Sequence, residues 1–364
     1  MPRRRPDRPT LATVAQEVGV STATVSYSFN RPDKVSAAVR ARVLAEARRQ
    51  GYSGPDPAAR QLSRGRTDTL GLLFTDELPY AFTDPAAIAF IQGLSTSCRS
   101  AGLNLLLVST DSSGGRSSAV DHAIVDGFVV YSVASDDPHL ARILERRLPT
   151  VVVDFPPDVP GVDWVGPDDR AGGRAMGELV TGLGHRRIGI VTAGARPSYS
   201  GPTSLPTIER AAPTLERLRI LGFADALAAA GVDDLTIEQR GANTQEAGAD
   251  ALDALLDRRP DLTAVCAMMD MLALGALTAA RNRGLDVPGD LTVTGYDDIP
   301  GAAQAGLTTI SQPLVDKGRI AGDLYLSRRP GMPPRRRLLP LHLQARRSSG
   351  PPGQHELATS VRSR

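Results

Sequence analysis

The segment Thr10–Asn30 (TLATVAQEVGVSTATVSYSFN) limits the possible folds of this chain most narrowly, because two short helical patterns flank a tight turn. The first pattern has an apolar stripe at helical spacing, made of Leu11, Val14, Ala15 and Val18. Thr10 and Ser21 are predicted to cap the two helices, since each hydroxyl can accept an otherwise unpaired amide. Gly19 permits a left-handed turn residue and Val25 fills the space between the helices, as a helix-turn-helix requires.

The outward side of the second helix separates this interpretation from its alternative, an ordinary helical hairpin inside a core. Thr22, Ala23 and Ser26 make that side short and polar, and arginines lie before and after the motif. Residues 1–66 contain 13 Lys and Arg against 5 Asp and Glu, whereas the remainder contains 29 against 35. A basic head on a mildly acidic body indicates that the head binds a polyanion, and a helix of this kind can enter the major groove of DNA. A solvated basic tail would lack the apolar periodicity.

A third helix and a linker complete the predicted N-terminal region. Ser36 is expected to cap a helix that runs to Gln50 and ends at Gly51, a position that favours a left-handed residue. The Ala/Arg/Gln/Leu run after Pro57 can form about two helical turns, which are marginal alone in water. It either folds against DNA or a second copy of itself, or it is a plain interdomain linker.

From Thr69 onward, strand and helix patterns alternate, which is typical of parallel sheets covered on both faces. The predicted strands are 70–74, 104–109, 127–131, 150–154, 188–192, 236–240, 264–268 and 291–295. The predicted helices are 85–101, 138–147, 170–183, 214–230, 244–257 and 271–283. About 275 residues of this pattern suffice for two lobes. The Pro/Ser/Gly-rich stretch 194–213 is predicted to be a long loop that is functional or mobile.

The cysteines and the missing motifs limit compartment and activity. Cys98 and Cys266 are expected to be buried and unpaired, which matches a reducing compartment. No run of about 18 apolar residues predicts a membrane span, and no apolar run follows the basic start, so we expect a cytoplasmic protein. Because GxGxxG after a strand, a P-loop, GxSxG and metal-spaced His or Cys clusters are all missing, we expect no enzyme, cofactor or metal site. His185 is expected to cap helix carbonyls.

Taken together, these segments resemble the LacI/GalR family of bacterial transcription regulators, from Thr10 to about Ser349. The matching segments are TLATVAQEVGVSTATVS, VSAAVRARVLAEARRQGY, AARQLSRGRTDTLGLLF, VDGFVV, GELVTGLGHRRIGIV, RILGFADAL, DMLALGALTAARNRGLDVPGDLTVTGYDDIP and LTTISQP. The resemblance implies a helix-turn-helix head, a hinge helix and a two-lobed α/β body with the fold of periplasmic sugar-binding proteins. The expected boundaries are a disordered arm at 1–9, the head at 10–54, the hinge at 55–67, the body at 68–347 and a disordered tail at 348–364.

The resemblance also implies which residues contact palindromic operator DNA. Thr22, Ala23 and Tyr27 correspond to residues that face base edges, and Tyr27 stands where many members carry arginine. The residues expected at phosphates are Ser21, Thr24, Asn30, Ser36 and Arg40, although Ser21 and Ser36 can serve purely as caps. In the hinge, Ala59 and Leu62 are expected to contact DNA, with Leu62 wedged between base pairs in the minor groove.

Six residues are expected to bind a small effector, possibly a sugar, between the lobes. Arg219, Asp270 and Asp154 match family ligand positions, with an Arg219–Asp270 ion pair as the alternative for the first two. Met269 stands where members usually have Asn. Tyr80 and Phe82 can stack on a ligand ring or merely pack in their loop, while Asp84 caps the next helix.

The resemblance favours a ligand-responsive repressor over two other classes of protein. A solute-binding transport protein with the same two-lobed body would need a secretory signal and no basic head, and an enzyme would need the missing motifs. The family implies a homodimer or a tetramer, but no heptad pattern near the C-terminus predicts a tetramerising coiled coil.

Overall fold

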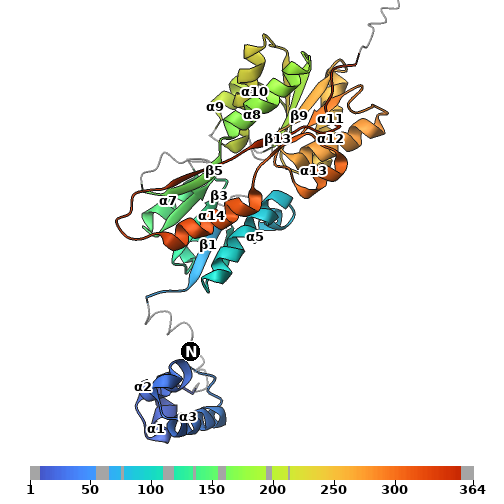
Figure 1. Cartoon of the computed structure of the whole chain (residues 1–364). Coiled ribbons are helices and arrows are strands. Elements are labelled where there is room, and N and C mark those ends of the chain that lie inside the picture. Colours follow the sequence, from blue (N-terminus) through green and yellow to red (C-terminus); the bar gives the residue numbers. More distant parts are fainter. Residues whose placement is uncertain are drawn as a thin grey trace, which may run out of the picture. The chain divides into compact units, whose positions relative to one another are not determined.

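A computed structural model describes residues 9–54, 65–74, 78–109, 119–133, 137–154, 161–193, 199–211 and 214–353. The chain divides into two compact units, Met1–Asp68 and Thr69–Arg364, which are treated separately below (Figure 1). The predictions for Ala59 and Leu62, and nearly all of the arm at 1–9, lie outside the described residues.

The N-terminal unit contains the three predicted helices. Their bounds are α1 (Leu11–Val18), α2 (Thr22–Asn30) and α3 (Ala37–Gln50), with a short 3-10 turn, η1 (Pro32–Lys34), between the last two. The predicted caps are confirmed, because the Thr10 Oγ1 and Ser21 Oγ atoms accept amides of their own helices at 3.3 Å and 3.0 Å. Gly19 has a φ of 72°, the left-handed conformation that the turn requires.

Small aliphatic side chains close the core of this unit. The fully buried members are Val14, Ala15, Val18, Val25, Val43 and Ala47. Phe29 and Tyr52 add an edge-to-face pair with ring centroids 5.8 Å apart. Since the inward faces of all three helices contribute, this head has a core of its own.

The C-terminal unit has two lobes, each built on a largely parallel sheet. The N-lobe sheet has the order β12-β5-β4-β3-β1-β2 and the C-lobe sheet the order β10-β9-β6-β8-β7. The N-lobe strands are β1 (Thr69–Phe74), β2 (Asn104–Ser109), β3 (Gly127–Tyr131), β4 (Thr150–Val153), β5 (Asp163–Pro167) and β12 (Arg336–Leu339). The C-lobe strands are β6 (Ile188–Ala193), β7 (Gly201–Thr203), β8 (Leu235–Arg240), β9 (Ala264–Ala267) and β10 (Thr292–Thr294). Only β7 pairs antiparallel among these strands, and a separate antiparallel pair joins β11 (Thr309–Ser311) to β13 (His342–Gln344).

Helices flank both sheets (Figure 1). The N-lobe has η2 (Leu78–Phe82), α5 (Pro85–Ser100), α6 (Ala119–His122), α7 (Pro138–Glu145) and α14 (Leu314–Ser327). The C-lobe has α8 (Asp169–Gly182), α9 (Leu205–Arg210), α10 (Leu215–Ala229), α11 (Gln245–Arg258), α12 (Asp270–Asn282) and α13 (Pro300–Ala305). The predicted architecture is therefore confirmed, and most of the predicted helices begin and end within one or two residues of those observed.

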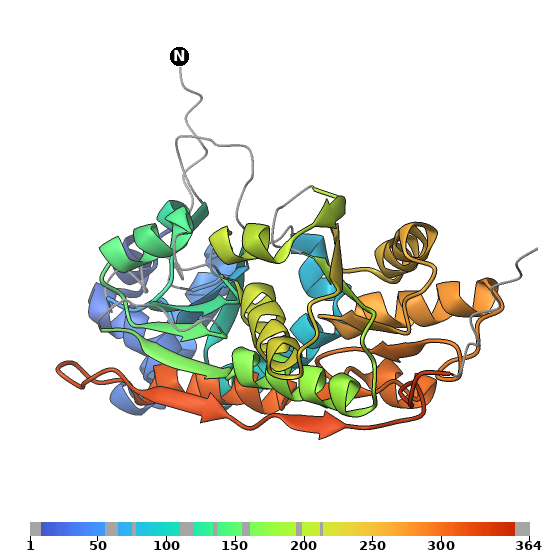
Figure 2. The same ribbon diagram turned by 90° about the horizontal axis from the view of Figure 1, so that it is seen from above.

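The chain passes between the lobes three times, after β5, after β11 and after β12. Figure 2 shows the last strands in red, running from one lobe to the other. The second passage returns α14 to the N-lobe, where it packs on α5 at very short range. A Cβ on Gly93 would lie 1.9 Å from the Val315 carbonyl oxygen, so only glycine permits this approach. The sequence-based reading ended at residue 295 and did not predict α14 or the last three strands.

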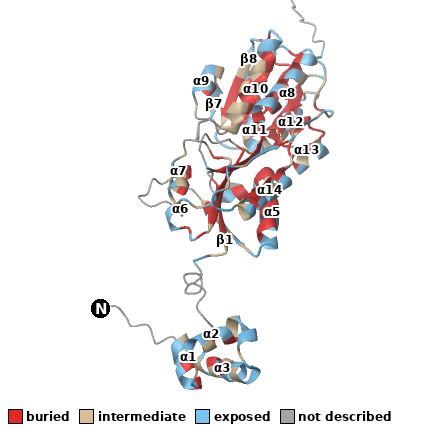
Figure 3. Cartoon of the chain, turned by 60° about the vertical axis from the view of Figure 1, so that its left-hand side comes forward, coloured by how far each residue is buried: buried red, intermediate tan, exposed pale blue. Residues whose placement is uncertain are grey.

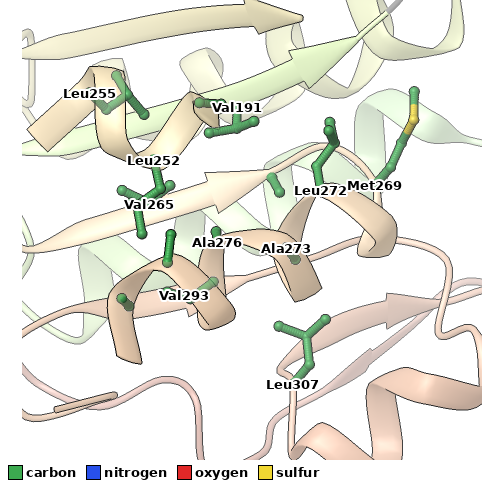
Figure 4. Close-up of a cluster of buried hydrophobic side chains, with 14 of the residues drawn as sticks. Val191, Leu252, Leu255, Val265, Met269, Leu272, Ala273, Ala276, Val293 and Leu307 are labelled. Carbon is green, nitrogen blue, oxygen red and sulfur yellow. The ribbon is translucent and has the colours of Figure 1, made fainter. Parts of the chain in front are cut away.

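Buried aliphatic side chains line the sheets of both lobes (Figure 3). In the C-lobe, residues of β6, β9 and β10 pack against α11 and α12, as Val191, Val265, Leu252 and Leu272 illustrate (Figure 4). Cys98 and Cys266 are free and buried, as predicted, and burial raises the pKa of their thiols to about 11 and about 12. In the described part of the chain, no helix is long and apolar enough to span a membrane.

Two segments expected to lack regular structure contain ordered residues. The stretch 194–213 includes strand β7 and helix α9, and Ile208 of α9 is fully buried. The tail was expected to be disordered from Ser348. Instead, the Ser348 hydroxyl donates to the Val293 carbonyl at 2.6 Å and accepts the Thr308 amide at 2.8 Å. Residues 348–353 therefore pack against the C-lobe, and residues 354–364 lie outside the described part.

Candidate functional site

The second helix of the head presents its predicted base-reading residues to solvent. Thr22 and Ala23 are exposed, and 47% of the Tyr27 surface is accessible. Val25 and Ser28 of the same helix are buried. Because helix positions three or four residues apart share a face, this arrangement leaves a continuous polar surface free for a partner.

The residues predicted at phosphates have mixed surroundings. Ser21 and Ser36 cap α2 and α3, and the Ser21 and Thr24 hydroxyl oxygens lie 2.9 Å apart. The Asn30 amide reaches the Ser26 hydroxyl at 3.5 Å. Arg40 is exposed, but its Nε donates to the Ser28 carbonyl at 3.1 Å, which ties α3 to α2. The capping role of the two serines is compatible with a phosphate contact, since a helix N-terminus attracts anions.

A second candidate site is a cavity of about 90 Å³ between the two lobes of the C-terminal unit. Its lining residues are Phe74, Asp84, Ala86, Tyr131, Ser132, Asp154, Leu215, Glu216, Arg219, Asn243, Met269, Asp297, Gln312 and Lys317. Three of the N-lobe residues stand at the ends of neighbouring parallel strands: Phe74 ends β1, Tyr131 ends β3 and Asp154 follows β4. Open α/β sheets bind ligands at this carboxyl edge.

Arg219 of α10 is held in one position by four partners. Its Nε donates to Asp169 at 2.8 Å and its Nη1 to the Met268 carbonyl at 2.7 Å, while Nη2 lies 3.0 Å from Asp297. The guanidinium also stacks 3.7 Å from the centroid of the Tyr296 ring. Burial alone would lower the pKa of Arg219, but Asp297 and Asp169 outweigh it and raise that pKa well above its ordinary value. The alternative pairing of Arg219 with Asp270 is wrong, because the carboxylate partners are Asp169 and Asp297.

Asp154 belongs to a polar chain that connects the lobes. Its carboxylate accepts the ammonium of Lys317, which also donates to Gln312 Oε1 at 2.8 Å. Gln312 in turn donates from Nε2 to Asp297 Oδ1 at 2.6 Å. The chain therefore runs from Asp154 in the N-lobe to Asp297 and Arg219 in the C-lobe. Asp154 has a φ of 71°, a left-handed conformation that is uncommon outside glycine and is enriched at functional sites.

Asp270 does not line this cavity, although it was predicted to bind the effector. One carboxylate oxygen accepts the Thr309 hydroxyl at 2.7 Å and the other accepts the Ile299 amide at 2.9 Å. Burial, together with the nearby charge of Asp297, raises the pKa of Asp270 to about 8. The first residue of α12 therefore joins the helix to the segments after β10 and before β11.

Replacing Asp270 with asparagine is expected to remove a pH dependence of stability. The folded-state pKa of about 8 exceeds the unfolded value of about 4, so the wild type loses stability as pH rises between these values. An asparagine amide can accept from Ile299 and donate to Thr309. The variant should therefore exceed the wild type by roughly 3 kcal/mol at pH 8 and match it at pH 5. Urea unfolding at both pH values measures this, and equal slopes for the two proteins would contradict it.

The predicted aromatic residues of the loop after β1 differ in placement. Phe82 is 60% exposed and does not line the cavity, which agrees with neither stacking on a ligand there nor packing in the loop. Tyr80 lies in η2, but its side chain is outside the described part. Asp84 caps α5, as predicted, by accepting the Ala87 amide at 3.0 Å, and it lines the cavity. The aromatic rings at the cavity belong instead to Phe74 and Tyr131, with centroids 5.2 Å apart.

Sequence reasoning missed Asp297, Gln312 and Lys317. A signal was available for Asp297, which comes two residues after a predicted strand, as Asp154 directly follows another. His185 was also assigned a different role. Its ring contacts Thr263 Oγ1 and donates to the Gly350 carbonyl, both at 2.9 Å, and burial lowers its pKa. It therefore fastens the C-terminal segment and does not cap α8. In the described part, no group of three or more His, Cys, Asp or Glu could hold a metal ion.

Comparisons with known proteins match both units. Residues 10–54 match the family model described as bacterial regulatory proteins, lacI family, and residues 178–349 match that of the periplasmic binding protein-like domain. The chain is 45% identical to the HTH-type transcriptional regulator Rv3575c of Mycobacterium tuberculosis, over 96% of this chain and 99% of the relative. The crystal structure of a LacI-family transcriptional regulator from Corynebacterium glutamicum is 32% identical, with a TM-score of 0.70 over 94% of this chain and 98% of that one. The complex of the transcriptional regulator CelR with cellobiose is 30% identical, with a TM-score of 0.64 over 94% and 100%.

Proposed function

This chain belongs to the LacI family of bacterial transcriptional regulators, and from this premise we propose that it is a repressor whose operator affinity is set by a small polyhydroxylated effector between the lobes. The chain carries a DNA-binding head and a ligand-binding type of body, and regulation by a small molecule is the function of this combination. The alternative of a transport solute-binding protein is not favoured, because such a protein has no use for the head.

The observation that carries the proposal is the polar chain across the interlobe cavity. Asp154, Lys317, Gln312, Asp297 and Arg219 connect the lobes through side chains that line the cavity. The cavity volume of about 90 Å³ is well below the roughly 300 Å³ at the lower end of ligand pockets. A sugar-sized effector must therefore separate or rearrange the lobes. Ligand occupancy and lobe geometry are linked for that reason, which is the requirement for allosteric control.

At the other end of the chain, we propose that two copies read a palindromic operator through Thr22, Ala23 and Tyr27. Ser21, Thr24, Asn30, Ser36 and Arg40 are the proposed phosphate contacts, and Ala59 and Leu62 the proposed hinge contacts. The exposed face of α2 supports the first set. Two buried, unpaired thiols are consistent with a place in the reducing cytoplasm, where the DNA lies. The complex of CelR with cellobiose supports a sugar as the effector class.

Genome-wide footprinting of the full-length protein tests this function, followed by binding to the recovered duplex with and without candidate sugars. We expect palindromic sites and an affinity that one compound changes at least fivefold, the lower range of allosteric coupling, which is about 1 kcal/mol. Binding that is indifferent to sequence at moderate salt would contradict the proposal.

Replacing Tyr27 with arginine is expected to change the base preference at one position of each half-site. A guanidinium can bond guanine O6 and N7 together, which discriminates against other bases by about 1–3 kcal/mol, and a phenol cannot. Selection from duplexes randomised at the half-site should therefore recover guanine opposite residue 27 for the variant alone. Tyr27→Ala is the control and should lose preference only at that position. Identical selected sites for the wild type and Tyr27→Arg would show that residue 27 does not face bases.

A further inference from the structure

The interlobe cavity contains two cation–carboxylate pairs, one from each lobe. Lys317 and Asp154 make the N-lobe pair, and Arg219 and Asp297 make the C-lobe pair. All four side chains are more than nine-tenths buried, and all four line the cavity. Gln312 lies between the pairs and bonds to one member of each. The pairs therefore face a common space from two sides.

Each pair keeps hydrogen-bonding capacity for a ligand. An ammonium has three N–H donors, and Asp154 and Gln312 take two of those of Lys317. A guanidinium has five, and Asp169, Met268 and Asp297 take three of those of Arg219. In the described part of the chain, the bonds that reach the carboxylates of Asp154 and Asp297 from these partners all fall on Oδ1. A donor and an acceptor thus remain side by side in both pairs.

A hydroxyl group matches such a pair, because it donates one hydrogen bond and accepts up to two. Two neighbouring hydroxyls can donate to the carboxylate and accept from the cation at the same time. The rings of Tyr131 and Phe74, on the N-lobe side of the cavity, offer an apolar wall for the C–H groups of such a compound. The composition of the site therefore fits a polyol bound at two of its edges.

The net charge of the lining excludes one large class of sugar derivatives. Asp84, Asp154, Glu216 and Asp297 are acidic, whereas Arg219 and Lys317 are the basic residues of the lining. Both cations already have carboxylate partners within the cavity, so a phosphate would meet an excess of negative charge. Like charges disfavour each other strongly where water is excluded.

We propose that Lys317 and Asp154 bind the effector directly, as the N-lobe counterpart of Arg219 and Asp297, and that the cavity accepts uncharged polyhydroxy compounds and rejects their phosphates. This inference rests on the proposed function, in which the cavity is the effector site. It adds the charge of the effector and assigns two of the residues that read its hydroxyl groups.

The single tryptophan of the chain provides a readout next to the proposed site. Trp164 donates from Nε1 to the Asp154 carbonyl at 3.0 Å, so a ligand that touches Asp154 should change its fluorescence. Full-length protein is titrated with ribose, xylose, glucose, galactose, mannitol and cellobiose, and with ribose 5-phosphate and glucose 6-phosphate. We expect at least one neutral compound to bind, and each phosphate to bind at least about tenfold more weakly than its parent.

Each outcome of this titration is decisive. A phosphate that binds as tightly as its parent, or more tightly, would overturn the inference and leave effector control of the regulator standing. If no compound changes the fluorescence or the affinity for footprinted DNA, the polyol site is overturned together with its regulatory role, while the DNA-binding function stands.

A double variant tests whether Lys317 and Asp154 read the ligand. Lys317→Met with Asp154→Asn removes both charges together, so no unpaired buried ion remains. Asparagine also tolerates the left-handed backbone of residue 154. We expect the affinity for the neutral compound to fall at least about tenfold, measured by calorimetry with circular dichroism as the check of folding.

Arg319→Met is the matched control on the same helix, because Arg319 is a half-exposed cation that pairs with Asp316 and Asp323. It should leave the affinity for the compound unchanged. A folded double variant with wild-type affinity would overturn the assignment of Lys317 and Asp154, and a double variant that does not fold is replaced by Lys317→Arg. Arginine keeps the charge but changes the donor geometry. It should weaken binding of the same compound severalfold, and unchanged affinity would again overturn the assignment.

Discussion

Replacing Ala23 with aspartate is expected to weaken operator binding by about 100-fold or more, because it places a carboxylate on the surface that meets phosphates and base edges. Ala23 is exposed and is the second residue of α2. An acidic side chain near a helix N-terminus is favourable by about 0.3–1 kcal/mol, which offsets the lower helix propensity of aspartate. The head should therefore stay folded while binding is lost. Fluorescence anisotropy with a footprinted duplex measures the affinity, and thermal unfolding measures the stability.

The same substitution at Ala45 provides the control. Ala45 is an exposed residue of α3, outside the α2 surface. Ala45→Asp adds an equal charge to the same unit and should change operator affinity only slightly at moderate salt. Equal losses for the two variants would show that net charge, and not the face of α2, governs binding.

Replacing Arg219 with alanine is expected to destabilise the C-terminal unit by about 3–5 kcal/mol, because it leaves buried carboxylates without their cation. Arg219 and Asp169 are almost completely buried, and Asp297 is buried as well. Removing the guanidinium also ends its stacking on Tyr296 and its bond to the Met268 carbonyl. Urea unfolding at pH 7 measures the loss, which should become smaller at pH 5 as the carboxylates take up protons.

A second substitution separates the electrostatic cause from loss of packing. Arg219→Ala combined with Asp169→Asn removes one of the two stranded charges and should recover part of the lost stability. Asp169 is suited to this test because burial raises its pKa despite the neighbouring Arg219. If the double variant were no more stable than Arg219→Ala, the cost would come from the cavity left by the side chain.

Local signals in the sequence predicted the head in detail. Thr10, Ser21 and Ser36 are caps because a hydroxyl before a helix satisfies a nearby amide, and this interaction needs only three or four neighbouring residues. Gly19 and Gly51 adopt left-handed φ values of 72° and 73° for an equally local reason. The same local logic identified Asp84 as the cap of α5. Such features do not depend on distant parts of the chain, so a single sequence contains them.

The cavity shows where this kind of reasoning ended. Asp154 and Arg219 were found through the family resemblance, and both line the cavity, but the same resemblance suggested Asp270, which bonds to Thr309 and Ile299 instead. The partners of Arg219 are Asp169, 50 residues before it, and Asp297. No periodicity relates residues at such separations, because their contact depends on how α8, α10 and the end of β10 pack.

By itself, the sequence determined the head with its capped helices, the alternation of strands and helices in the body and the family to which the chain belongs. Periodicity, capping and turn chemistry act over a few residues, and they are written directly in the order of side chains. Only the tertiary structure decided that α14 returns to the N-lobe and brings Lys317 to Asp154, 163 residues away. The close packing of Gly93 on α5 against α14 sets that position. A buried ion pair between such distant residues exists because two packed layers bring them together, and local sequence has no pattern that records it.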